Sequence, residues 1–174
     1  MLWGYNGVSF NHDDIGNPLS YYNGSSYTFT WKQGRRLATA DVNGYELEFT
    51  YNDEGIRTSK TINGITHYYH LAGSQILSEE WTDTSEVTHL LVYNYDADGT
   101  IMGMSYRNST YTDTQRFDSY LFIKNIQGDV LHIYDENGNK VVSYLYDAWG
   151  NITSTTGSMA STVGEMNPFR YRGL

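Results

Sequence analysis

Polar and apolar positions alternate along much of the chain, most regularly over residues 140–146. In an extended chain, Val142 and Tyr144 lie on one face, and Ser143 and Leu145 lie on the other. Alternation at period two, rich in Val and Tyr, predicts a half-buried strand. The strand runs into Tyr-Asp-Ala-Trp-Gly-Asn, where Asp can bond its own backbone and Gly can adopt a positive φ. This stretch therefore predicts a strand followed by a tight turn.

Two kinds of turn signal recur through the sequence. The first is Asn-Gly, found at Asn6–Gly7, Asn23–Gly24, Asn43–Gly44, Asn63–Gly64 and Asn137–Gly138. The second is x-x-Gly after an aromatic or polar strand end, found at Gly16, Gly34, Gly55, Gly73, Gly99, Gly128 and Gly150. Asn-Gly favours the type I′ hairpin turn, which needs positive φ at both central residues. We therefore expect positive φ at Gly44, Gly64 and Gly138.

The spacing of these signals predicts the fold class. Between residues 7 and 73 the two signals alternate, with gaps of 8 to 11 residues. Such spacing leaves strands of about five to seven residues joined by short turns. We predict an all-β fold, an antiparallel meander of repeated β-hairpins with about fourteen strands, whose sheet is twisted and curled.

The rhythm loosens in three places. The polar segments 82–86 and 108–114 lack the glycine signals, which predicts longer hairpin loops that project from the sheet. Residues 154–162 are mostly small, and predict a linker. No long segment has the 3.6-residue period of a helix, so we expect at most one helical turn, over residues 164–166.

Composition narrows the possible functions. The chain has 17 Tyr and 17 Gly but only 2 Pro among its 174 residues, a mixture that favours strands and turns. Its net charge is −9, and no basic stripe is present, so we expect no nucleic-acid partner. The absence of Cys excludes disulfides. No apolar run reaches the length of a membrane span, and residues 1–20 lack a signal-peptide pattern. Any export signal is expected on a longer parent chain.

Candidate metal sites are weak. Asp96–Gly99 is similar to the start of a calcium loop, but the twelfth position is Arg107, where a bidentate Glu is needed. His67 and His70 fall on opposite faces of a strand and cannot share one metal. We therefore predict no metal and no cofactor.

The sequence also lacks recognisable catalytic motifs. It contains neither a Gly-x-Ser-x-Gly elbow nor a phosphate-binding loop. The carboxylates of Asp13, Asp14, Asp53 and Glu54 fall at turn positions, where such residues commonly cap the backbone. We predict no catalytic residues and no enzyme. Tyr and Trp on one sheet face could stack on sugar rings, so carbohydrate or partner binding by a β-module remains the alternative function.

The repeated turn and the last residues together point to a family. The turn signature is clearest at Tyr146, Asp147, Gly150 and Asn151. The second motif, which we call the terminal box, consists of Asn167, Pro168, Phe169, Arg170, Tyr171, Arg172 and Gly173. With these motifs the chain resembles the YD-repeat proteins, also called Rhs-repeat proteins, in their Gram-positive wall-associated branch. Residues 1–119 resemble the repeat region. Residues 120–174 resemble the truncated start of the Rhs-repeat-associated core domain.

The resemblance implies a structural function. Repeats of this family form a hollow shell, which in polymorphic toxins encloses a toxin. The implied function is therefore a non-enzymatic scaffold segment of the encapsulating shell of a secreted or cell wall-associated bacterial protein. Its implied partners are further repeats, the rest of the core and a toxin cargo, and cell-wall or surface carbohydrate is the partner of the alternative function. The family's self-cleaving acids lie beyond the terminal box and have no counterpart here, so we expect no self-cleavage.

Two further expectations concern the ends of the chain. Arg170 and Arg172 are two residues apart, which places them on one face of an expected strand, with a structural role. A shell fragment also exposes unpaired strand edges, expected here near Val8 and near Phe169. Such edges predict self-association.

Overall fold

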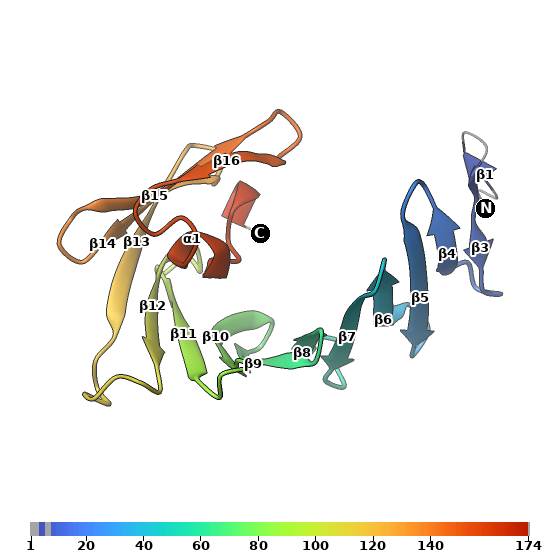
Figure 1. The fold of residues 1–174 in the computed structure, drawn as a ribbon, viewed down its shortest axis with the longest axis horizontal. Helices are drawn as coiled ribbons and strands as arrows, with labels where there is room; N and C mark the ends of the chain where they lie inside the picture. Colours follow the sequence, from blue (N-terminus) through green and yellow to red (C-terminus); the bar gives the residue numbers. More distant parts are fainter. Residues whose placement is uncertain (1–3, 6–7, 174) are drawn as a thin grey trace. The chain divides into compact units, whose positions relative to one another are not determined.

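Hairpins dominate the computed structural model, which describes residues 4–5 and 8–173 (Figure 1). Its strands are β1 (Gly4–Tyr5), β2 (Val8–Ser9), β3 (Asn11–His12), β4 (Pro18–Tyr22), β5 (Ser26–Lys32), β6 (Arg36–Val42), β7 (Tyr45–Tyr51), β8 (Arg57–Ile62), β9 (Ile65–Ala72), β10 (Gln75–Thr82), β11 (Thr88–Tyr95), β12 (Ile101–Asn108), β13 (Asp118–Lys124), β14 (Val130–Asp135), β15 (Lys140–Tyr146) and β16 (Ile152–Thr156). The helical elements are α1 (Val163–Met166) and the 3₁₀ turn η1 (Tyr171–Gly173). The all-β antiparallel class predicted from the sequence is confirmed.

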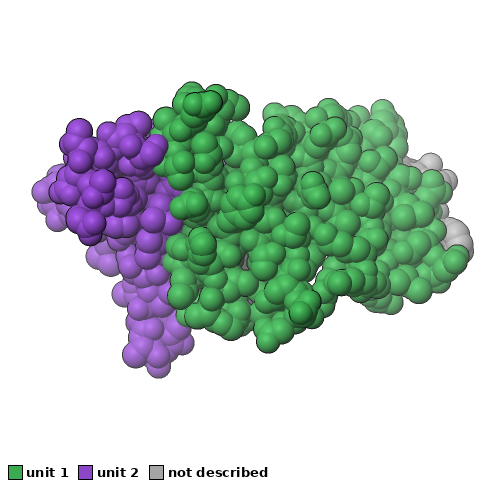
Figure 2. Space-filling view, turned by 90° about the horizontal axis from the view of Figure 1, so that it is seen from below, with its two compact units in different colours: residues 1–88 green, residues 89–174 purple. Residues whose placement is uncertain are grey.

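The chain divides into two compact units, residues 1–88 (unit 1) and 89–174 (unit 2), coloured separately in Figure 2. Within each unit the strands pair antiparallel with their neighbours in chain order, β3 to β10 in unit 1 and β11 to β16 in unit 2. The short strands β1 and β2 pair with each other. The boundary predicted between residues 119 and 120 rests on sequence motifs and stays a prediction.

The sheet of unit 1 has two chemically different faces. On one face Phe29 lies opposite Ala40, and the guanidinium of Arg57 lies over the Phe49 ring, 4.3 Å from the ring centroid. On the other face Thr30 lies opposite Thr39, and their hydroxyl oxygens are 2.6 Å apart. The period-two alternation of the sequence therefore separates an aromatic face from a hydroxyl-rich face.

Unit 2 has a closed core. Its buried side chains are Leu91, Tyr93, Ile101, Met104, Tyr120, Phe122, Val130, Ile133, Val141, Val142, Tyr144 and Val163. The segment after β16 folds back onto the sheet, where the Met159 N–H donates to the Val141 carbonyl (3.0 Å). The Tyr144 hydroxyl reaches the same segment and donates to the Gly164 carbonyl (2.7 Å). The segment therefore covers one face of this sheet.

The predicted glycine conformations are confirmed, with φ of 87° at Gly44, 85° at Gly64 and 79° at Gly138. Asn43 and Asn63 also have positive φ, so both of their pairs form turns of type I′ geometry. Asn137 is absent from the positive-φ residues of the described chain. The type I′ prediction is therefore wrong for Asn137–Gly138, which belongs to a longer turn that begins at Asp135. It is also wrong for Asn23–Gly24, where only the glycine has a positive φ (98°). Asn6–Gly7 lies outside the described residues.

Two predicted irregular segments are more regular than expected. The 82–86 segment is no projecting loop. The Glu86 N–H donates to the Asp83 carbonyl (3.1 Å), and Glu86 takes the positive φ of 62° that glycine takes in the other turns. The predicted linker is also partly wrong, because Ser154 and Thr155 belong to β16 and pair with β15. The β-branched threonines there suit a strand better than a linker.

The longer loop predicted after residue 108 is present between β12 and β13. Asp118 lies opposite Tyr106, so the chain between them forms the end of the hairpin. Inside it, the Tyr111 hydroxyl donates to an Asp118 oxygen, and the Arg116 guanidinium donates to the other at 2.8 Å. The loop is therefore stabilised by its own side chains.

Candidate functional site

The turn between β15 and β16 shows why the repeated signature has its particular residues. The Asp147 N–H donates to the Asn151 carbonyl (2.9 Å), and the Gly150 N–H donates to the Asp147 carbonyl (3.1 Å). Asp147 Oδ1 accepts from the N–H groups of Trp149 (2.8 Å) and Asn151 (2.9 Å). Asp147 Oδ2 accepts from Asn151 Nδ2 (2.7 Å). One carboxylate thus binds two backbone N–H groups and one side-chain amide of the same turn.

The same pattern recurs at other turns of the described chain. In each, the first residue donates its N–H to the carbonyl four residues on, and its Oδ1 accepts the N–H of that residue. These turns begin at Asp13, Asn52, Asp83, Asp96, Asn125, Asp135 and Asp147. The calcium-like sequence at Asp96 is one of them. We call this arrangement the Asx-closed turn.

Hydrogen bonding in these turns also affects acidity. The Nδ2 group of Asn151 lowers the pKa of Asp147, and the Nδ2 group of Asn139 lowers the pKa of Asp135. Backbone N–H donors add to both effects. Donors aimed at a carboxylate favour its charged form. These acids therefore act as anionic anchors for backbone at neutral pH.

The terminal box begins with a buried asparagine. Asn167 has no exposed surface, its Nδ2 donates to the Phe169 carbonyl (2.6 Å), and its Oδ1 accepts the Phe169 N–H (3.1 Å). These two bonds bend the chain around Pro168. The bend directs Phe169 against the sheet, with its ring edge-on to Tyr93 at 4.9 Å between centroids.

Arg170 supports the short helix before the box. Its Nη2 donates to the carbonyls of Gly164 (3.0 Å) and Glu165 (3.1 Å), and its Nε donates to the Asn167 carbonyl (3.1 Å). Carbonyls at a helix C-terminus lack partners within the helix, so a guanidinium satisfies them well. The guanidinium also lies 5.8 Å from the centroid of the Tyr144 ring.

The end of the box docks on two turns. The Val130 N–H donates to the Arg170 carbonyl (2.9 Å), and the Arg172 N–H donates to Asp129 Oδ1 (2.8 Å). The Tyr171 ring packs on Tyr146 at 5.9 Å. A Cβ added at Gly150 would lie 2.5 Å from the Tyr171 ring, so this turn needs glycine for contact as well as for conformation.

Two predictions about this region are wrong. Arg170 and Arg172 do not share a strand face, because Asn167 to Arg170 form no strand and Arg172 has a φ of 55° in η1. Nor does Phe169 lie at a sheet edge, since β16 is the last strand of the described chain and Phe169 packs on Tyr93. Phe169 contacts Tyr93 and Arg172 contacts Asp129, both far away in the sequence, and sequence spacing gives no sign of those contacts.

Two tyrosine hydroxyls of β15 donate to backbone carbonyls of neighbouring segments. Burial raises the pKa of Tyr146 to about 12, and its hydroxyl donates to the Val130 carbonyl (2.8 Å). Burial also raises the pKa of Tyr144, whose hydroxyl donates to Gly164. Both phenols therefore stay protonated at neutral pH and serve as donors.

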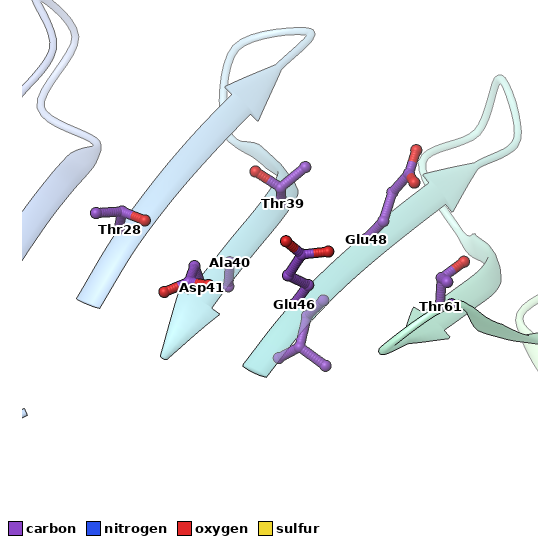
Figure 3. A pocket seen from close by; sticks show the side chains of 9 residues that line it. Thr28, Thr39, Ala40, Asp41, Glu46, Glu48 and Thr61 are labelled. Atoms are coloured by element: carbon purple, nitrogen blue, oxygen red, sulfur yellow. The ribbon is translucent and has the colours of Figure 1, made fainter. Parts of the chain in front are cut away.

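Unit 1 carries a shallow hollow on its hydroxyl-rich face (Figure 3). Its volume is about 400 Å³, and its lining residues are Thr28, Thr39, Ala40, Asp41, Glu46, Leu47, Glu48, Thr61 and Gly64. Asp41 lies directly opposite Glu46 on the neighbouring strand, and like charges in such a pair repel. The lining includes neither a basic nor an aromatic side chain, so the hollow lacks a surface on which a sugar ring could stack.

The two histidines of β9, His67 and His70, have different surroundings. His67 Nδ1 is 2.7 Å from Glu79 Oε1, and its ring stacks on Trp81 at 4.9 Å. His70 lies opposite Ser78 and is exposed. Over residues 4–5 and 8–173, no three His, Cys, Asp or Glu side chains gather as a metal site. Within the same residues no helix is long and apolar enough to span a membrane.

Comparison with known proteins relates the chain to short segments of much larger proteins. No family model matches the chain. The tRNA3(Ser)-specific nuclease WapA of Bacillus spizizenii is 31% identical over 172 residues, and the tRNA nuclease WapA of Bacillus subtilis is 31% identical over 179 residues. Each alignment covers 97% of this chain and 7% of the relative. The chain therefore spans a small part of the relatives it matches.

Solved structures show the same fold. The Photorhabdus luminescens Tc holotoxin pore with a TccC3 mutation matches with a TM-score of 0.59 at 12% identity, over 97% of this chain and 8% of that one. The TcdB2-TccC3-TEV crystal structure matches with a TM-score of 0.59 at 13% identity, over the same shares. At such identities the likeness concerns the fold alone. Together the comparisons support a repeat-shell protein in broad terms.

Proposed function

We propose that the chain is a non-enzymatic structural segment of the shell or scaffold of a secreted or cell wall-associated bacterial toxin protein. The main support is its 31% identity to WapA along 97% of its length. The fold match to Tc toxin chains adds support for a shell-like sheet. In this role the segment adds hairpins to a longer sheet and leaves the chemistry to other parts of a parent protein.

The use of polar side chains also supports this proposal. The aspartates and asparagines that begin the Asx-closed turns bind their own backbone, and Asn167 and Arg170 bind the backbone of the terminal box. These side chains use their hydrogen-bonding groups to hold the backbone of the folded chain. We expect them to contribute to stability and not to turnover.

A chimera tests the proposal. The matching segment of Bacillus subtilis WapA is replaced by this chain, and the tRNA nuclease activity of the chimera is compared with that of a variant that lacks the segment. We expect the chimera to keep the activity and to resist proteolysis better than the deletion variant. A chimera that behaves like the deletion variant would contradict a shared structural role. Cleavage of tRNA by the isolated chain would contradict the non-enzymatic part.

Carbohydrate binding remains a second candidate, favoured by one groove in unit 2. The groove has a volume of about 550 Å³ and is lined by Tyr146, Tyr171, Arg172 and Asp129 among others. Aromatic rings beside charged and amide groups suit a sugar. A glycan array with the parent and Tyr171→Ala decides this candidate. Binding that the variant loses supports it, and the absence of binding by the parent removes it.

A further inference from the structure

The described Asn-Gly pairs differ in how their reacting atoms are held. In any such pair the Gly amide nitrogen can attack the Asn side-chain carbon Cγ. The nitrogen gives its proton to solvent, the N–Cγ bond forms, and the Cγ–Nδ2 bond breaks as ammonia leaves. Water then opens the cyclic imide at either carbonyl, which yields Asp or isoaspartate. Glycine permits the attack most readily because it has no Cβ.

The two type I′ turns hold the Asn side chain in place. Asn43 Oδ1 accepts the Ser26 N–H (2.9 Å), and Asn63 Oδ1 accepts the Glu46 N–H (3.0 Å). Each Asn backbone N–H donates to the carbonyl of the same partner, at 3.2 Å for Ser26 and 2.9 Å for Glu46. The side chain therefore binds across to the preceding hairpin, and this bond must break before the side chain can turn toward the following nitrogen.

Asn137 is protected at its other reacting atom. It is exposed, and no hydrogen bond is recorded for its side chain within residues 8–173. The Gly138 N–H, however, donates to the Asp135 carbonyl (3.0 Å) inside an Asx-closed turn. The nitrogen can attack only if that bond opens.

Asn23 is held at neither atom. Its backbone N–H donates to the Ser25 carbonyl (3.2 Å), but in the described chain neither its side chain nor the Gly24 N–H takes part in a recorded hydrogen bond. Asn23 and Gly24 are both exposed, and a Cβ built on Gly24 would meet nothing within 4 Å. The reaction has free space and two free partners here.

We propose that Asn23 is a site of spontaneous deamidation and isoaspartate formation, and that the folded chain protects Asn43, Asn63 and Asn137. The product adds a negative charge and, as isoaspartate, one backbone atom between β4 and β5. Tyr22 lies opposite Ser26 at this turn, so the longer backbone shifts that pair. The first effect of ageing on the chain is therefore expected at this hairpin.

The experiment uses the unfolded chain as its own control. The full chain is kept at mildly alkaline pH, either in buffer or in concentrated urea, and the four sites are followed by peptide mass spectrometry with isoaspartate detection. In urea all four sites should react at similar rates, because their local sequences share Asn-Gly. In buffer Asn23 should keep its rate, while the other three slow by about tenfold or more, since an engaged group must first open.

Two outcomes would overturn the proposal. One is a folded chain in which Asn43, Asn63 or Asn137 reacts as fast as Asn23. The other is an Asn23 rate that falls on folding as much as the rates of the other three sites. The Asn23→Gln variant confirms the assignment, because it removes the modified peptide and should leave the other rates unchanged.

Discussion

At the scale of single residues, the chain depends on backbone angles that most side chains avoid. Positive φ occurs at the turn glycines from Gly16 to Gly150, and also at Glu86 (62°). The left-handed conformation costs a residue with a Cβ about 1–2 kcal/mol. The turn at Glu86 therefore forms through the bonds of Asp83 despite an unfavourable residue.

Replacing Glu86 by Gly should therefore stabilise the chain by about 1 kcal/mol, since the strain disappears and no recorded contact is lost. Glu54→Gly is the matched control. Glu54 precedes the turn glycine Gly55 and has no positive φ, so its replacement should not stabilise. Urea unfolding measures both variants. Equal midpoints for Glu86→Gly and the parent would mean that this turn is not strained.

The type I′ turns allow the opposite test. Gly44→Val and Gly64→Val should each destabilise the chain by more than about 1 kcal/mol, because a β-branched residue is strained at positive φ. A Cβ at either glycine meets nothing within 4 Å, so the loss comes from the backbone and not from a clash. Asn at the same positions should cost less, because Asn tolerates this conformation. Thermal melting that does not distinguish Val from Asn would contradict this explanation.

Aspartate anchors give the turns a dependence on pH. The pKa of Asp147 is lowered from its ordinary 3.8 by the Asn151 side chain and by backbone donors. A lowered folded pKa contributes stability above the ordinary value, and this contribution disappears as the pH falls through the folded pKa. Asp147→Asn should therefore weaken the decline in stability on acidification, measured by urea midpoints from neutral pH to below the ordinary value. A decline as steep as that of the parent would show that Asp147 contributes none of it.

At the scale of elements, the sequence predicts the hairpins well because both of its signals are local. Alternation at period two selects the buried face, and the turn residues limit each strand. The turn at residues 83–87 was not predicted because it contains no glycine. Asp83 carries the turn information for residues 83–87, so the first position of an Asx-closed turn is a better signal than its glycine. The small residues that follow Thr153 predict a linker, but Ser154, Thr155 and Thr156 belong to β16.

At the scale of the whole molecule, what the sequence could not predict is the docking of the terminal box. The family resemblance selects the residues of the box, but it gives neither their backbone conformation nor their contacts. Phe169 meets Tyr93, and Arg172 meets Asp129, across long separations in the sequence. Such contacts follow from tertiary packing, which neither spacing nor periodicity encodes. Self-association through strand edges, with β16 as the last strand, stays a prediction that light scattering over a range of concentrations can test.

Asn167→Ala provides the most direct measurement of the structural role. Asn167 is fully buried and bonds both backbone groups of Phe169, so its truncation leaves buried polar groups without partners. We predict a loss of about 2–3 kcal/mol in the free energy of unfolding, with the protein remaining at its full mass. Asn151→Ala, at an exposed turn, should cost clearly less. If Asn167→Ala unfolds at the same urea concentration as the parent, the terminal box does not stabilise unit 2, and the structural role given to it here is wrong.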